Sequence, residues 1–62
     1  MTVYGFDGDK DIQYIITGSR EYVANTMLAL MRSYTVAFTM SREALYRTRE
    51  TKVFKEVSLW EH

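Results

Sequence analysis

The sequence predicts a small α+β domain, in which a mostly antiparallel sheet packs against one amphipathic helix in the order β-β-α-β-(short α)-β. One window has a sustained helical period, and several short runs rich in β-branched and aromatic residues have the period of strands. The chain has 62 residues, 47% of them hydrophobic and none of them proline, which is typical of a folded domain. Because this length leaves room for one core only, we expect residues 1–62 to form a single domain.

The N-terminal part of the chain predicts a β-hairpin. The runs Thr2–Phe6 (TVYGF) and Ile12–Thr17 (IQYIIT) have strand composition, and Ile12, Tyr14 and Ile16 alternate onto one face of the second run. Between the two runs, DGDKD contains Asp-Gly and has the length of a hairpin loop. We expect this charged loop to be solvated and the hairpin to lead directly into the helix.

The helix is predicted over Ser19–Tyr34. Ser19 is suited to cap its N-terminus, Glu21 complements the positive end of the helix dipole, and Arg32 complements the negative end. At 100° per residue, one side of the helix is apolar and is expected to face the sheet; it holds Val23, Ala24, Met27, Leu30, Met31 and Tyr34.

Two further strands are expected after the helix. In Thr35–Met40, Val36, Phe38 and Met40 alternate onto one face, and Thr51–Trp60 closes the chain. The last strand has large apolar groups on both faces, so we expect both faces to be partly covered, one of them by another molecule. Between these strands, Ser41–Arg49 is either a short helix capped by Ser41 or a continuation of the third strand, and residue propensities favour the helix.

Composition argues against most kinds of chemistry. The chain lacks cysteine, its single histidine is His62, and its glycines match no phosphate-binding fingerprint. A nucleophile therefore has no base to activate it, and we expect no enzyme activity, no catalytic residue and no cofactor. Asp7, Asp9 and Asp11 have the spacing that opens a calcium loop, but positions six and twelve of such a loop hold Ile12 and Gly18, so we expect no metal site.

The segment from Arg42 to Lys55 is one candidate binding region. It interleaves aromatic residues with cations, a pattern that can hold phosphates while bases stack on the rings. The formal net charge of the whole chain is zero, whereas dedicated nucleic-acid binders are usually basic. A nucleic-acid-binding protein is therefore the alternative function, with these residues in contact: Arg42, Arg47, Arg49, Lys52 and Lys55.

The leading hypothesis is a small non-catalytic module that binds a larger protein. Interfaces favour Trp, Phe, Tyr and Arg, and the candidates for the contact patch are Trp60, Phe54, Tyr46 and Arg47. In size and style, though in no motif, the chain is similar to the accessory proteins with which phages bind or inhibit host proteins. A further alternative is a structural subunit of a homo-oligomer such as a homodimer, since a chain this short has a marginal core.

The sequence has no apolar run long enough to cross a bilayer, so no membrane partner is expected. Its N-terminal residues lack the basic and apolar regions of a signal peptide. The expected location is the cytoplasm.

Overall fold

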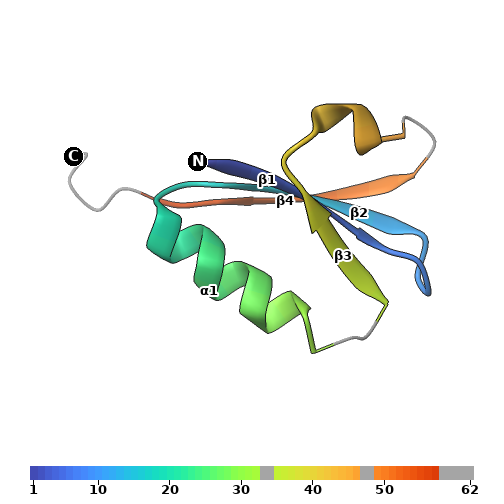
Figure 1. The fold of residues 1–62 in the computed structure, drawn as a ribbon, viewed down its shortest axis with the longest axis horizontal. Helices are drawn as coiled ribbons and strands as arrows, with labels where there is room; N and C mark the ends of the chain where they lie inside the picture. The colour runs from blue at the N-terminus through green and yellow to red at the C-terminus, as the bar shows by residue number, and fades with distance from the viewer. Residues whose placement is uncertain (33–34, 47–48, 58–62) are drawn as a thin grey trace.

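The computed structural model describes residues 1–32, 35–46 and 49–57, and in them the chain forms one four-stranded mixed sheet with one α-helix (Figure 1). The strand order is β3-β1-β2-β4. The elements in chain order are β1 (Thr2–Asp7), β2 (Ile12–Thr17), α1 (Arg20–Leu30), β3 (Val36–Thr39), a 3-10 turn η1 (Arg42–Ala44) and β4 (Glu50–Lys55). The α+β fold and the element order predicted from the sequence are confirmed.

Strands β1 and β2 form the predicted hairpin, with Val3 opposite Ile16 and Gly5 opposite Tyr14. The loop closes through Asp11, whose φ of 55° lies in the left-handed region that Asp adopts more readily than most residues. Asp7 departs from the expected solvated loop, because it is the last residue of β1 and only 1% exposed.

Helix α1 covers one face of the sheet, which we call the helix face. Val3, Tyr14, Ile16 and Val23 form the buried core there. Met27 and Leu30 of the predicted apolar side pack against this core, as do Phe38 of β3 and Phe54 of β4. The expectation for two residues of that side is wrong, since Ala24 and Met31 are exposed. Ala24 lies about 100° around the helix from the buried Val23, and Met31 is the C-cap that follows the last residue of α1. Tyr34 lies outside the described residues.

The start of α1 is fixed by two chain segments. Ser19 is the N-cap as predicted, and its hydroxyl accepts a hydrogen bond from the Tyr22 N–H at 3.1 Å. The Glu56 carboxylate, directly after β4, accepts from the Ser19 N–H at 2.8 Å and so brings negative charge to the positive end of the helix. The helix ends at Leu30 rather than Tyr34, which leaves Arg32 just beyond it.

Strand β4 pairs in parallel with β2, from Ile12 opposite Glu50 to Thr17 opposite Lys55. Of the predicted strand Thr51–Trp60, β4 takes in the residues up to Lys55 and ends there because its partner β2 ends at Thr17, where Gly18 turns the chain into the helix; residues 58–60 lie outside the described residues. Phe54 alone among its residues is half-buried, on the helix face, and Val53 is 64% exposed, so cover of the other face by another molecule stays a prediction. β4 is an edge strand whose lysines face water.

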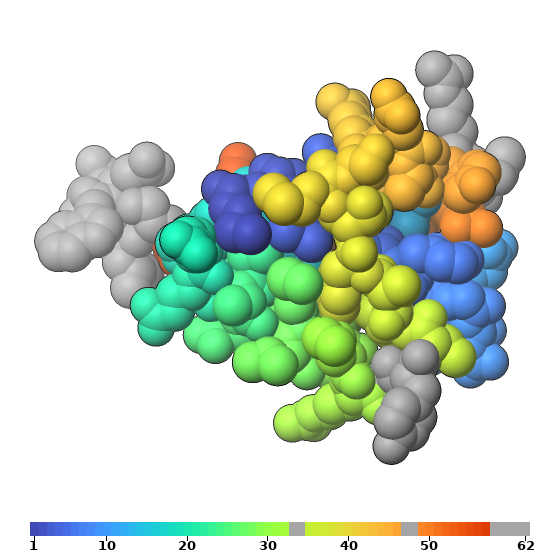
Figure 2. All heavy atoms as spheres, viewed as in Figure 1, coloured from blue at the N-terminus to red at the C-terminus, as the bar shows by residue number. Residues whose placement is uncertain are grey.

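The connection from β3 to β4 crosses the second face of the sheet, opposite the helix. It must pass from one edge of the sheet to the other, and α1 already occupies the helix face (Figure 1). The segment contains the favoured helical turn, but as the single turn η1, and the Ser41 side chain makes no capping hydrogen bond. In Figure 2 its yellow and orange atoms form a ridge on the side of the molecule away from the green helix. Among the described helices, none is long and apolar enough to cross a membrane.

Candidate functional site

A groove with an aromatic lining lies on the second face, between the sheet and the segment that crosses it. Its volume is about 330 Å³. We call it the aromatic groove; its lining is Tyr4, Gly5 and Phe6 of β1, Ala37, Phe38 and Thr39 of β3, and Ala44, Leu45, Tyr46 and Arg49 of the crossing segment.

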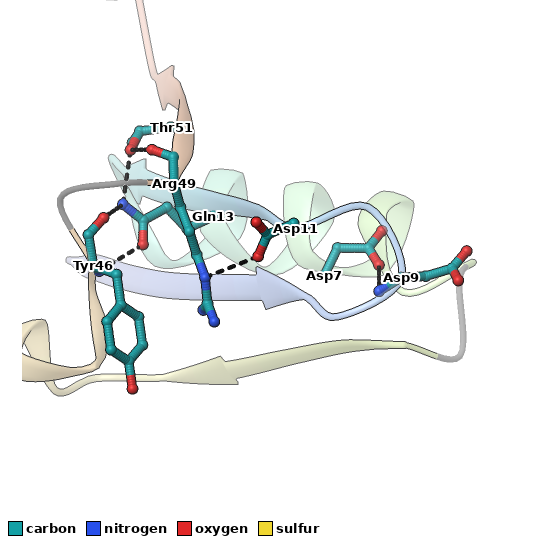
Figure 3. A network of polar contacts seen from close by, with 7 residues as sticks. All are labelled: Asp7, Asp9, Asp11, Gln13, Tyr46, Arg49 and Thr51. Carbon is teal, nitrogen blue, oxygen red and sulfur yellow. Dashed lines mark hydrogen bonds and ion pairs between the residues drawn. The ribbon is translucent and has the colours of Figure 1, made fainter.

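Gln13 fastens the crossing segment to the sheet. Its side chain is only 4% exposed, and its amide makes three hydrogen bonds (Figure 3). The Nε2 group donates to the Tyr46 carbonyl at 2.7 Å and to the Thr51 hydroxyl at 2.8 Å, while Oε1 accepts from the Tyr46 N–H at 2.9 Å. Gln13 thus pairs with both backbone groups of Tyr46 as a neighbouring strand would. This fixes the height of the groove wall above the sheet.

Arg49 closes one end of the groove between two rings. The carbon at the centre of its guanidinium is 3.7 Å from the centroid of Phe6 and 4.3 Å from that of Tyr46. Its Nε lies 3.1 Å from the Asp11 carboxylate, across the sheet edge (Figure 3). A cation is attracted to the faces of aromatic rings, so these contacts fix the orientation of the Arg49 side chain, which is 23% exposed. The two terminal nitrogens of Arg49 have no acceptor among the described residues, so they remain available as donors.

The chemistry of the groove is that of a binding surface. Its floor is apolar, its exposed rim is the Tyr46 side chain at 57% exposure, and its charged group is Arg49. The lining contains no carboxylate, histidine or cysteine that would act as a base or nucleophile. The arrangement suits an apolar group on the floor and an oxygen acceptor at Arg49.

The three hairpin aspartates diverge instead of converging on one point (Figure 3). Asp7 accepts a hydrogen bond from the Thr35 hydroxyl and another from the Asp9 N–H at 3.0 Å, whereas Asp11 pairs with Arg49. The hydrogen bond from Thr35 lowers the pKa of Asp7 below its ordinary value of 3.8, and the backbone N–H groups of Asp9 and Lys10 act in the same direction. Burial opposes them by raising this pKa. No cluster of three metal-ligating side chains is found within residues 1–32, 35–46 and 49–57.

The structure separates the residues predicted to form the protein contact patch. Tyr46 lines the aromatic groove. Phe54 lies on the helix face, where its ring centroid is 6.0 Å from that of Tyr14, so it belongs to the edge of the core. Arg47 and Trp60 lie outside the described residues.

The cations predicted for nucleic-acid binding are also dispersed. Arg49 is engaged by Asp11, Phe6 and Tyr46. Lys52 is in register with Tyr14 on the helix face, while Lys55 is in register with Thr17, whose side chain points to the second face. Arg42 is exposed in η1, and Arg47 lies outside the described residues.

Sequence reasoning missed Tyr4 and Phe6, which line the groove, and Gln13, which fastens the crossing segment to the sheet. The alternation of β1 carries a signal for the first two, since Val3 and Gly5 point to the helix face and Tyr4 and Phe6 to the other. For Gln13 the signal was its place in a strand rich in isoleucine, where its amide is expected to be buried. A buried amide requires hydrogen-bond partners.

Comparison with known proteins adds no assignment: no family model, no curated protein and no solved structure matches the chain.

Proposed function

We propose that this domain is a non-catalytic module that binds a larger protein through the aromatic groove. The observation that carries the proposal is the groove itself, which combines an apolar floor, an exposed tyrosine and an oriented arginine. Tyr and Arg are enriched at the energetic centres of protein interfaces. Gln13 and Asp11 hold Tyr46 and Arg49 in place before a ligand arrives, so little conformational freedom is lost on binding.

The shape and charges of the groove define the segment that fits it. One apolar side chain of the partner fills the space over Tyr4 and Leu45, and an oxygen acceptor that follows it receives hydrogen bonds from the terminal nitrogens of Arg49. A carboxylate is the stronger acceptor, so the preferred partner segment is apolar and acidic. The proposal includes an accessory or inhibitory role of the phage type, toward a host protein met in the cytoplasm.

The test is capture of partners from a nuclease-treated lysate on immobilised wild-type protein, on Tyr46→Ala and on Val53→Ala, with elution in steps of rising salt. Both residues are exposed and large, at 57% and 64%, but Val53 lies outside the groove. The expected result is a stoichiometric protein band that Val53→Ala retains and Tyr46→Ala loses. The affinity of the purified pair should fall about 30-fold with Tyr46→Ala, as for the loss of a central aromatic contact of about 2 kcal/mol.

Circular dichroism of the variants provides the folding control, because Gln13 binds only the backbone of Tyr46. Equal retention of the band by folded Tyr46→Ala would refute the groove as the binding site. Bound material that disappears with nuclease or at modest salt would instead support the nucleic-acid alternative, since phosphate contacts release counterions.

A further inference from the structure

The outer side of α1 carries an exposed apolar stripe. Ala24, Leu28 and Met31 have the spacing i, i+4, i+7, which aligns them along one side of the helix. Leu28 is 67% exposed, Met31 is 52% exposed, and Ala24 is exposed as well. The stripe lies away from the sheet, which α1 contacts through Val23 and its neighbours.

Opposite charges flank the stripe at its two ends. Glu21 stands in the first turn of α1, and Arg32 follows the C-cap Met31. If the spacing of 100° per residue is continued past the cap, both lie on the same flank of the stripe, about 20° apart around the axis. Neither forms an ion pair with another residue in the described part of the chain, where the one ion pair joins Arg49 to Asp11.

We propose that a second copy of this chain docks on the stripe, with the two helices antiparallel about a two-fold axis near Thr26. In that arrangement Leu28 of each copy lies over the small Ala24 of the other, which lets the helices approach closely. The two-fold axis keeps the charged flanks on the same side, so Glu21 of each copy meets Arg32 of the other. A parallel two-fold pair would instead place the charged flanks of the two copies on opposite sides of the contact, where Glu21 and Arg32 would have no partner.

The small size of the domain means that a dimer contact would add substantially to its stability. Only four hydrophobic residues are buried in the described part of the chain, and the sequence has no cysteine to add a disulfide. Burial of exposed Leu and Met side chains between copies couples folding to association and adds stability. The aromatic groove lies on the opposite face of the sheet, so the dimer leaves both grooves accessible.

The test is the mass of the purified protein across a wide concentration range, measured by sedimentation equilibrium on wild type, Leu28→Lys and Met40→Lys. Met40 is the matched control, because its side chain is 70% exposed but far from α1 in the chain, at the end of β3. The proposal expects a dimer that Leu28→Lys converts to a folded monomer and that Met40→Lys leaves intact. Wild type that stays monomeric at every concentration, or a dimer that survives Leu28→Lys, would overturn it.

A charge swap tests the antiparallel register separately. Glu21→Arg places two cations together at both ends and should weaken the dimer, by up to about fivefold for each exposed pair that is lost. The double variant Glu21→Arg/Arg32→Glu restores the pairing and should recover the wild-type dissociation constant. Failure of the double variant to recover it, with circular dichroism showing a folded chain, would overturn the register. Both readouts are independent of any partner held by the groove.

Discussion

The guanidinium of Arg49 stacks on the ring of Phe6 at 3.7 Å, although the two residues lie on different elements and far apart in the sequence. The contact ties the end of the crossing segment to β1, across β2. It also accounts for the 23% exposure of an arginine on the surface of a small domain. Among the described residues of the predicted nucleic-acid set, Arg49 is the one that contacts an aromatic ring. Its partners, Phe6, Tyr46 and Asp11, are all within the protein.

We expect this contact to contribute measurably to stability. A double-mutant cycle with Arg49→Met and Phe6→Leu should give a coupling free energy of about 0.5–1 kcal/mol in chemical unfolding, since a cation over a ring at a partly exposed site has that strength. Arg42→Met serves as the control because Arg42 is exposed in η1 and should change stability little. A coupling near zero would mean that the stacked geometry adds nothing beyond the burial of each side chain.

Gln13→Leu should be among the more damaging substitutions on the second face. It leaves the Tyr46 N–H without its partner and leaves the Tyr46 carbonyl only the 3.4 Å hydrogen bond from the Arg49 N–H, at a cost of about 1–3 kcal/mol for the unsatisfied part-buried groups. Thr51→Val removes one hydrogen bond of the same amide, together with the long 3.4 Å bond from the Thr51 hydroxyl to the Arg49 carbonyl, and should cost about 1 kcal/mol. Urea unfolding of both variants measures the difference, and equal losses would contradict the role given to Gln13.

Gly5→Ala should destabilise the sheet by steric overlap. A Cβ at Gly5 would lie 2.8 Å from two ring carbons of Phe38 on the helix face, and relieving such an overlap costs about 1–3 kcal/mol. Gly8→Ala is the matched control, because the nearest side-chain atom there is 3.7 Å away. Thermal unfolding of the pair tests the prediction, which fails if Gly5→Ala melts no lower than Gly8→Ala.

The carboxylate of Asp7 should make stability depend on pH in the acid range. Its folded-state pKa is lowered below 3.8, first by the hydrogen bond from Thr35, so its ionised form binds protons less readily in the folded than in the unfolded chain. The contribution is therefore fully present above pH 3.8 and is lost as the pH falls through the folded-state pKa.

Asp7→Asn removes this titration. The difference in unfolding free energy between wild type and Asp7→Asn should shrink from neutral pH toward acid. Denaturant unfolding at several pH values measures this difference. A gap between wild type and Asp7→Asn that stays constant with pH would show that Asp7 contributes through geometry alone.

Local patterns by themselves determined the elements of this fold. Strand alternation identified the hairpin, the helical period identified α1, and Ser19 was recognisable as a cap because its hydrogen bond closes within three residues. These features depend on interactions between residues close together in the sequence, so they can be predicted from the residue types alone. The placement of Ile12, Tyr14 and Ile16 on a common face follows from the same two-residue period.

Only the tertiary structure decided which segments lie beside one another, and with that the candidate site. The sequence of a strand does not specify which strand lies beside it or in which direction, so nothing local predicts that β4 pairs with β2 and that the connection from β3 to β4 crosses the second face. That crossing brings Tyr46 and Arg49 to Phe6 and Gln13, while it leaves Phe54 on the opposite face. The aromatic groove is made by contacts between residues distant in the chain, and such contacts depend on topology rather than on residue type.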